Sequence, residues 1–177
     1  LGVDTVSERM LDELLMNAEV PMVVDADALN ILSNNIELLR TSSVQIIMTP
    51  HMKEMSRLIQ RPVEEIAKNR FAVAREFAKK MQVTLVLKDA KSIATNGGQQ
   101  TYMNLAGNNG MSTGGSGDVL AGIIAGMLAG GLTLADAARM GTYIHCRAGD
   151  LAAEHKGNYA MLASDIISYI GEVMRHE

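Results

Sequence analysis

The sequence predicts an α/β fold with a mainly parallel central sheet, and two observations favour it. Short apolar segments of strand length alternate with longer segments in which apolar residues recur at helical spacing, the order expected of βαβ units. After the third short segment, Asn96-Gly97-Gly98 is a strong hairpin signal, which predicts that a hairpin closes one edge of the sheet. With 177 residues and 47% apolar content, we expect one α/β domain over residues 1–177.

The first half of the chain is expected to alternate helices and strands. Residues 4–17 carry apolar residues near helical spacing behind a possible capping pair, Asp4 and Ser7, and predict a surface helix. Residues Pro62–Met81 predict one long amphipathic helix with a solvated basic face. The expected strands are Pro21–Val24, Val44–Met48 and Val83–Leu87.

The second half is expected to contain the hairpin and then helices only. The hairpin strands are Ser92–Thr95 and Gln100–Asn104. A helix over Val119–Leu128 is apolar on every face, which predicts that it is buried, and Gly122 and Gly126 would admit another backbone against one side. Further helices are expected over Leu134–Glu154 and over Ile166–Arg175, the latter capped by Ser164-Asp165.

The composition excludes several classes of partner. A net charge of −4 argues against nucleic acid or an anionic membrane as the main partner, because both favour a basic face. Cys146 is the only cysteine, so neither an internal disulfide nor a cysteine-based zinc site is possible, which fits a reducing, cytoplasmic compartment. The longest apolar run, Val119–Ala135, falls short of a membrane span.

The segment Gly107–Gly131 is the strongest candidate for chemistry. Its glycines allow backbone N–H groups to approach a ligand, and the start of the following helix adds unpaired amides and a positive dipole. A phosphate group is the expected ligand. One carboxylate, Asp118, lies where the glycine loop meets the following helix. It either caps the helix or accepts the proton of an attacking hydroxyl, and the neighbouring glycines favour the second role.

The run G-N-N-G-M-S-T-G-G-S-G-D-V-L-A-G, residues 107–122, closely resembles the signature of the ADP- or ATP-dependent NAD(P)H-hydrate dehydratases. The resemblance extends to T-P-H-M-K-E-M at residues 49–55 and K-D-A-K-S at residues 88–92. It implies a three-layer αβα ribokinase-like fold. Because this family has a G-P-G-L-G turn near Leu1-Gly2, preceded by more of the same domain, it also implies that the chain is the C-terminal portion and that the N-terminal part of the domain is absent.

The resemblance implies the roles of individual residues. Asp118 would be the catalytic base and no protein residue a metal ligand. The implied substrate-binding residues are Gly2, Asp25, Asp27, His51 and Asp118. The implied nucleotide-binding residues are Lys88, Asp89, Ala90, Lys91, Ser92, Gly114, Gly115, Ser116 and Gly117.

Four of these residues also have an alternative role that involves no ligand. One of Asp25 and Asp27 caps the next helix, His51 is structural, or Lys88 is merely solvated. The chain also departs from the family at two positions where that family has glycine. Lys53 replaces one glycine; Asp89 replaces the other and adds negative charge beside a polyphosphate, where it either binds ribose or weakens nucleotide affinity.

The implied reaction repairs hydrated NADH or NADPH. A ring hydroxyl is phosphorylated by ADP or ATP with Mg²⁺, phosphate leaves, and the dihydronicotinamide is restored; members of the family are commonly homotetramers. Two alternatives remain open from the residues alone. One is a ribokinase-like kinase of a vitamin precursor or sugar hydroxyl, and the other is a nucleotide-binding module without catalysis.

Overall fold

A computed structural model describes residues 2–175, and contacts divide the chain into two compact units. The first unit comprises the residues up to Asp89 together with Ile93–Tyr102. The second comprises Ala90–Ser92 and the residues from Met103 onward. Among residues 2–175, no helix is long and apolar enough to cross a membrane.

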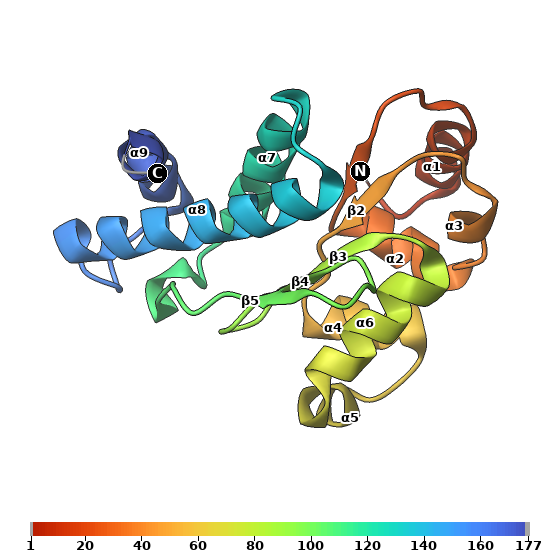
Figure 1. Cartoon of the computed structure of the whole chain (residues 1–177), viewed down its shortest axis with the longest axis horizontal. Coiled ribbons are helices and arrows are strands. Elements are labelled where there is room, and N and C mark those ends of the chain that lie inside the picture. The colour runs from red at the N-terminus through yellow and green to blue at the C-terminus, as the bar shows by residue number, and fades with distance from the viewer. Residues whose placement is uncertain (1, 176–177) are drawn as a thin grey trace. The chain divides into compact units, whose positions relative to one another are not determined.

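The expected α/β architecture is confirmed, and its sheet is mixed. The five strands are β1 (Met22–Val24), β2 (Ile46–Met48), β3 (Thr84–Leu87), β4 (Ile93–Thr95) and β5 (Thr101–Met103), in the order β1-β2-β3-β4-β5. β1, β2 and β3 are parallel neighbours, whereas β4 is antiparallel to β3. The three predicted parallel strands and the hairpin at one edge are therefore present (Figure 1).

Six helices lie in the described part of the first unit, and several of them share one hydrophobic core with β2 and β3. They are α1 (Thr5–Asn17), α2 (Asp27–Asn34), α3 (Leu38–Thr41), α4 (Met52–Ile59), α5 (Val63–Lys68) and α6 (Arg70–Met81). Asp4 caps α1 as predicted, since its carboxylate accepts from the backbone N–H groups of Val6 and Ser7. Burial of β2 and β3 gives the core its centre: every residue of both strands is buried.

The prediction of one continuous helix over Pro62–Met81 is wrong. The helix is broken at Asn69, whose backbone (φ −145°, ψ 46°) is not helical, so α5 ends at Lys68 and α6 starts at Arg70. Asparagine competes with helical hydrogen bonding and is a weak helix former, which permits the break. The break changes the helix direction, and both Ile66 of α5 and Ala74 of α6 are fully buried in one core.

The second unit is built from helices. They are the short 3₁₀ helix η1 (Asn109–Met111), α7 (Ser116–Ala129), α8 (Leu134–Lys156) and α9 (Ala163–Arg175). α8 contacts both α7 and α9 (Figure 1). Gly141 permits the contact with α7, because a Cβ there would lie 2.6 Å from Cγ1 of Ile124.

The prediction that the glycine-loop helix is buried on every face is wrong. Leu120, Ile123 and Ile124 of α7 are buried, but Gly122 and Gly126 are exposed. Nothing lies within 4 Å of a Cβ built at either glycine, so no described residue packs against them. Uniform apolarity predicts burial only where neighbours exist on all sides, and within this unit the helix has neighbours on one side.

The last helix starts earlier than predicted. α9 begins at Ala163, so Asp165 lies within its first turn, where it accepts a hydrogen bond from the backbone N–H of Leu162. Its other oxygen lies 2.7 Å from Nζ of Lys156 at the end of α8. This pair ties the end of α8 to the start of α9.

We expect the contribution of this pair to stability to disappear in acid. The hydrogen bond from Lys156, with that of Leu162, lowers the pKa of Asp165 in the folded protein. A depressed carboxyl pKa stabilises the fold above the unfolded value, near pH 4, and that stabilisation is lost as pH falls through the lower folded value. Urea unfolding of wild type and Asp165→Asn should therefore differ at pH 7, and the difference should shrink as the pH falls through the lowered pKa of Asp165. An undiminished difference in acid would contradict this assignment.

Candidate functional site

The first unit gathers polar residues at the carboxyl ends of its three parallel strands. Asp25 follows β1, Thr49-Pro50-His51 follows β2, and Lys88 follows β3. Lys88 donates its backbone N–H to the carbonyl of Pro50, and His51 and Lys88 extend the strand pairing by one parallel bridge. The carboxyl ends of parallel strands are where open α/β sheets bind ligands.

Asp25 and Lys88 form an ion pair that sequence reasoning missed. Nζ of Lys88 lies 2.7 Å from Oδ1 of Asp25, and only 19% and 14% of the two side chains are exposed. Neither residue is merely solvated. The resemblance implies a role at the substrate for Asp25 and a role at the nucleotide for Lys88. The structure brings the two residues together although they are 63 positions apart in the sequence.

Asp27 is the first residue of α2 and is half-buried. The N-cap of α2 is Ala26, and α2 has no side-chain cap hydrogen bond. The alternative in which Asp25 or Asp27 caps this helix is therefore wrong.

Between the two aspartates, Ala26 has a strained backbone. Its φ of 54° and ψ of −121° lie in a region normally occupied by glycine. Strain of this kind persists only where surrounding structure holds it, and it concentrates at functional sites.

Replacing Ala26 with glycine is expected to raise the free energy of unfolding by about 1 kcal/mol, because glycine adopts this backbone without strain. Chemical denaturation measures the difference. Ala72→Gly in α6 is the matched control and should instead lower stability by about 1 kcal/mol, since helical backbone favours alanine. A destabilised Ala26→Gly protein would show that the backbone at this position is not strained.

Thr49 is fully buried beside these residues, and its Oγ1 has no hydrogen-bond partner among residues 2–175. A buried hydroxyl without a partner is costly and is seldom retained without a reason. The predicted motif identified His51 in this segment but gave no sign that the threonine hydroxyl is unpartnered.

His51 is the N-cap of α4. Its Nδ1 accepts hydrogen bonds from the backbone N–H groups of Lys53 and Glu54, each at 3.1 Å, while Glu54 accepts from the backbone N–H of His51 at 2.7 Å. Glu54 and His51 thus form a capping box, so the structural role of His51 is present. Nδ1 is used in the cap, and Nε2 lies 3.4 Å from Oε1 of Glu54, so both ring nitrogens contact groups of α4. Lys53 is in helical backbone, where glycine is not needed.

Asp89, which stands where the family has glycine, has a positively charged partner. The carboxylate of Asp89 pairs with the guanidinium of Arg70, the first residue of α6. Sequence reasoning treated Arg70 as part of a solvated face and missed this contact. Of the three predicted nucleotide-binding residues that follow, Ala90 and Lys91 are exposed, whereas Ser92 is buried and its carbonyl accepts from the backbone N–H of Asn104.

In the second unit, the start of the glycine loop is anchored by Asp150 of α8. Both carboxylate oxygens of Asp150 accept from the backbone N–H of Gly107, at 3.1 and 3.0 Å, and Oδ1 also accepts from the amide of Asn108. The same side-chain amide donates to the carbonyl of Gly149. α8 thus holds the start of the loop through a carboxylate.

The loop presents free amides at the start of α7. Within the described residues, the backbone N–H groups of Gly114, Gly115 and Gly117 donate to no protein acceptor. Gly115 is the N-cap in left-handed conformation, with φ of 87° and no side-chain cap, whereas Gly117 is already helical. Unpaired amides at a helix N-terminus are suited to an anion such as phosphate.

Ser116 is buried, and its hydroxyl is held by His145 of α8. Oγ of Ser116 and Nε2 of His145 lie 3.2 Å apart, so the hydroxyl is engaged within the unit. Cys146, the next residue, is inert near neutral pH, because burial and the charge of Asp150 raise the pKa of its thiol to about 12.

Asp118 is exposed in the first turn of α7. Its carboxylate makes no hydrogen bond or ion pair with residues 2–175, and the helix has no side-chain cap. The capping interpretation of Asp118 is therefore not supported by any contact. A carboxylate beside free loop amides has the composition of a phosphoryl-transfer site, in which amides bind phosphate and the carboxylate accepts a proton. Gly2, the remaining predicted site residue, is exposed and precedes the α1 cap Asp4.

Residues 2–175 contain no group of three or more His, Cys, Asp or Glu side chains that could hold a metal ion.

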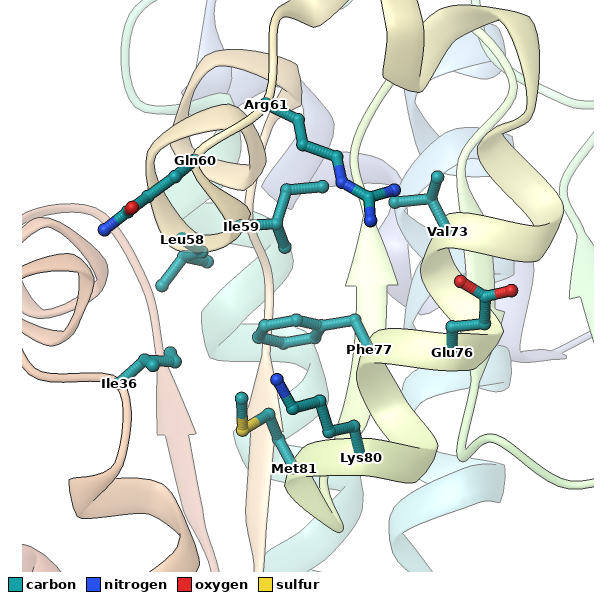
Figure 2. Close-up of a pocket in the computed structure, with 10 residues that line it drawn as sticks. All are labelled: Ile36, Leu58, Ile59, Gln60, Arg61, Val73, Glu76, Phe77, Lys80 and Met81. Atoms are coloured by element: carbon teal, nitrogen blue, oxygen red, sulfur yellow. The ribbon is translucent and has the colours of Figure 1, made fainter.

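The first unit also has a pocket of about 360 Å³ that contains none of the predicted site residues (Figure 2). It lies between the last turns of α4 and α6, on the side of the amino ends of the strands and thus away from Asp25 and Lys88. Its lining consists of Ile36, Leu58, Ile59, Gln60, Arg61, Val73, Glu76, Phe77, Lys80 and Met81.

Comparison with known proteins identifies close similarities. The family model described as NAD(P)H-hydrate dehydratase matches residues 1–172. The bifunctional NAD(P)H-hydrate repair enzyme Nnr of Moorella thermoacetica is 40% identical over 176 residues, which are 99% of this chain and 33% of that protein. The chain thus spans about a third of the length of the bifunctional relatives that it matches.

Solved structures show similarity to the same family. The ADP/ATP-dependent NAD(P)H-hydrate dehydratase from Bacillus subtilis, co-crystallised with ATP/Mg²⁺, superposes with a TM-score of 0.87 at 26% identity, covering 99% of this chain and 61% of that one. A ribokinase-like superfamily protein from Enterococcus faecalis superposes with a TM-score of 0.81 at 29% identity, covering 99% and 60%. With the family match over nearly its whole length, the chain belongs to the NAD(P)H-hydrate dehydratase family.

Proposed function

We propose that the protein is an ADP/ATP-dependent NAD(P)H-hydrate dehydratase, a hydro-lyase that uses ADP to repair the S form of hydrated NADH or NADPH. The observation that carries the proposal is the set of free amides at Gly114, Gly115 and Gly117 beside the unpartnered carboxylate of Asp118. Family membership supports the same activity.

In this mechanism, Asp118 accepts the proton of the ring hydroxyl as the hydroxyl attacks the terminal phosphoryl group. The amides of Gly114, Gly115 and Gly117 donate to the phosphoryl oxygens and stabilise the charge that develops there. The phosphate group is then eliminated and the ring loses a proton, which restores the double bond of the dihydronicotinamide. The nucleotide becomes AMP when ADP is the donor.

The proposal also assigns binding roles to residues that follow the parallel strands. Nucleotide is bound by Lys88 and the segment Asp89–Ser92, and the substrate by His51, with Asp25, Asp27 and Gly2 on the substrate side. Because Asp25 already pairs with Lys88, its proposed role is to orient the ammonium toward phosphate. Magnesium that accompanied the nucleotide would offset the negative charge of its phosphates, and no protein side chain is proposed to hold it.

We further propose that residues 1–177 form one α/β domain, the C-terminal portion of a three-layer αβα ribokinase-like domain. The parallel order of β1, β2 and β3 supports this proposal, as do the ribokinase-like structural neighbours. A cytoplasmic homotetramer is the assembly we propose for the native protein.

The test incubates the full native polypeptide with hydrated NADH and ADP and follows recovery of dihydronicotinamide absorbance. We expect absorbance to recover with stoichiometric release of AMP and phosphate. Accumulation of a phosphorylated substrate instead would indicate a kinase, and ADP binding without turnover would indicate a nucleotide-binding module.

A further inference from the structure

The proposed function makes no use of the pocket between the last turns of α4 and α6 (Figure 2). Its volume of about 360 Å³ falls within the range of about 300–1,000 Å³ that is typical of small-molecule sites. All of its lining residues belong to the first unit. The pocket is therefore complete within one compact part of the chain.

Most of the lining is apolar and is continuous with the core. Leu58, Phe77 and Met81 are each at most 6% exposed, and they belong to the hydrophobic cluster that includes residues of β2 and β3. Ile59 and Val73 are partly buried and pack against the same cluster. A ligand in the pocket would therefore contact side chains that the core holds in place, and it would remove apolar surface from water.

Two cationic side chains complete this apolar lining. Arg61 and Lys80 are exposed, and neither side chain forms a hydrogen bond or an ion pair with any residue in the range 2–175. Figure 2 shows the guanidinium of Arg61 and the ammonium of Lys80 turned toward the pocket. Both groups can therefore donate to a ligand without first breaking a contact within the described part of the chain.

The end of α4 holds the backbone of Arg61 in place. Gln60 is the C-cap in left-handed conformation, with φ of 53°, and turns the chain out of the helix. The backbone N–H of Arg61 donates to the carbonyl of Ser56 at 3.1 Å, and the hydroxyl of Ser56 donates to the carbonyl of Arg61. Because both backbone groups of Arg61 are bonded to α4, its guanidinium stays within reach of the pocket.

The charge of the lining favours a ligand with a single negative charge. Glu76 is the third charged residue of the lining, so Arg61, Lys80 and Glu76 together carry a net charge of +1. A carboxylate balances that charge and matches a planar guanidinium through two parallel hydrogen bonds. A phosphate monoester carries about two negative charges at pH 7 and would leave one of them unbalanced.

We propose that this pocket is a binding site for a small apolar monocarboxylate. The hydrocarbon body lies against Phe77 and its apolar neighbours, and the carboxylate accepts hydrogen bonds from Arg61 and Lys80. The site does not depend on the proposed function, because it shares no residue with the strand ends or with the glycine loop.

Octanoate is the probe, and isothermal titration calorimetry on the full native polypeptide measures its Kd. We expect saturable binding at one site per chain. Hexanoate should bind about tenfold more weakly, because it buries two fewer methylene groups. Octan-1-ol, which has the same number of carbons but no charge, should also bind about tenfold more weakly.

Exchange of single charges tests the two cations and the carboxylate of the lining. Arg61→Gln and Lys80→Gln are each expected to raise the Kd for octanoate about fivefold and to leave that for octan-1-ol unchanged. Glu76→Gln should lower the Kd for octanoate about threefold, because it removes a like charge. Lys79→Gln is the matched control: Lys79 is an exposed cation of α6 outside the lining, and its replacement should change neither constant.

Three results would overturn the inference. One is equal affinity of the wild-type protein for octanoate and octan-1-ol. Another is a loss of octanoate affinity in Lys79→Gln as large as that in Lys80→Gln. The third is the absence of octanoate binding to the wild-type protein at millimolar concentration.

Discussion

Replacing Asp118 with asparagine is expected to lower kcat for repair of hydrated NADH by about a thousandfold, the order of magnitude that a general base contributes. The amide has nearly the same shape but accepts no proton from the ring hydroxyl. Because the carboxylate makes no contact within the described residues, stability should change by less than about 0.5 kcal/mol. The Kd for ADP should stay within about twofold of wild type, since the loop amides remain.

Steady-state kinetics, calorimetric titration with ADP and thermal unfolding together test this expectation. Asp136→Asn is the matched control, because Asp136 is also an acidic residue in the first turn of a helix, α8, of the same unit. It should retain normal turnover. Near-normal turnover of Asp118→Asn would remove this carboxylate from the mechanism.

Replacing Lys88 with methionine is expected to cost about 3 kcal/mol of unfolding free energy, because it leaves the largely buried carboxylate of Asp25 without its partner. Binding of ADP should be lost as well, since the ammonium proposed to contact phosphate is gone. Urea unfolding and calorimetry measure the two effects. Lys53→Met, at an exposed position of α4 with no ion pair among residues 2–175, is the matched control and should change stability by less than about 0.5 kcal/mol.

The double variant Asp25→Asn/Lys88→Met distinguishes stability from binding. It has no uncompensated charge, so we expect most of the lost stability to return while ADP binding stays absent. If Lys88→Met were as stable as wild type, the pair would be fully solvated in solution. If the double variant bound ADP normally, Lys88 would have no role at the nucleotide.

Local signals predicted most elements because they act over a few residues. Strand lengths, the Asn96-Gly97-Gly98 turn and the cap Asp4 depend on neighbouring side chains and backbone geometry, which the sequence states directly. The break at Asn69 was missed because the apolar spacing runs through it, and only packing of Ile66 and Ala74 in one core selects the broken form. The expectation of a fully buried α7 failed for a related reason, since burial depends on neighbours rather than on composition.

The sequence by itself determined the kinds of group available and their local setting: a glycine loop leading into a helix, a carboxylate in its first turn, and polar residues at the carboxyl ends of three strands. Only the tertiary structure decided which groups meet. Asp25 pairs with Lys88, Asp89 with Arg70, and Ser116 with His145. A side chain reaches a few ångströms, so its partner is set by where separate elements pack, and residue type and spacing along the chain do not contain that information.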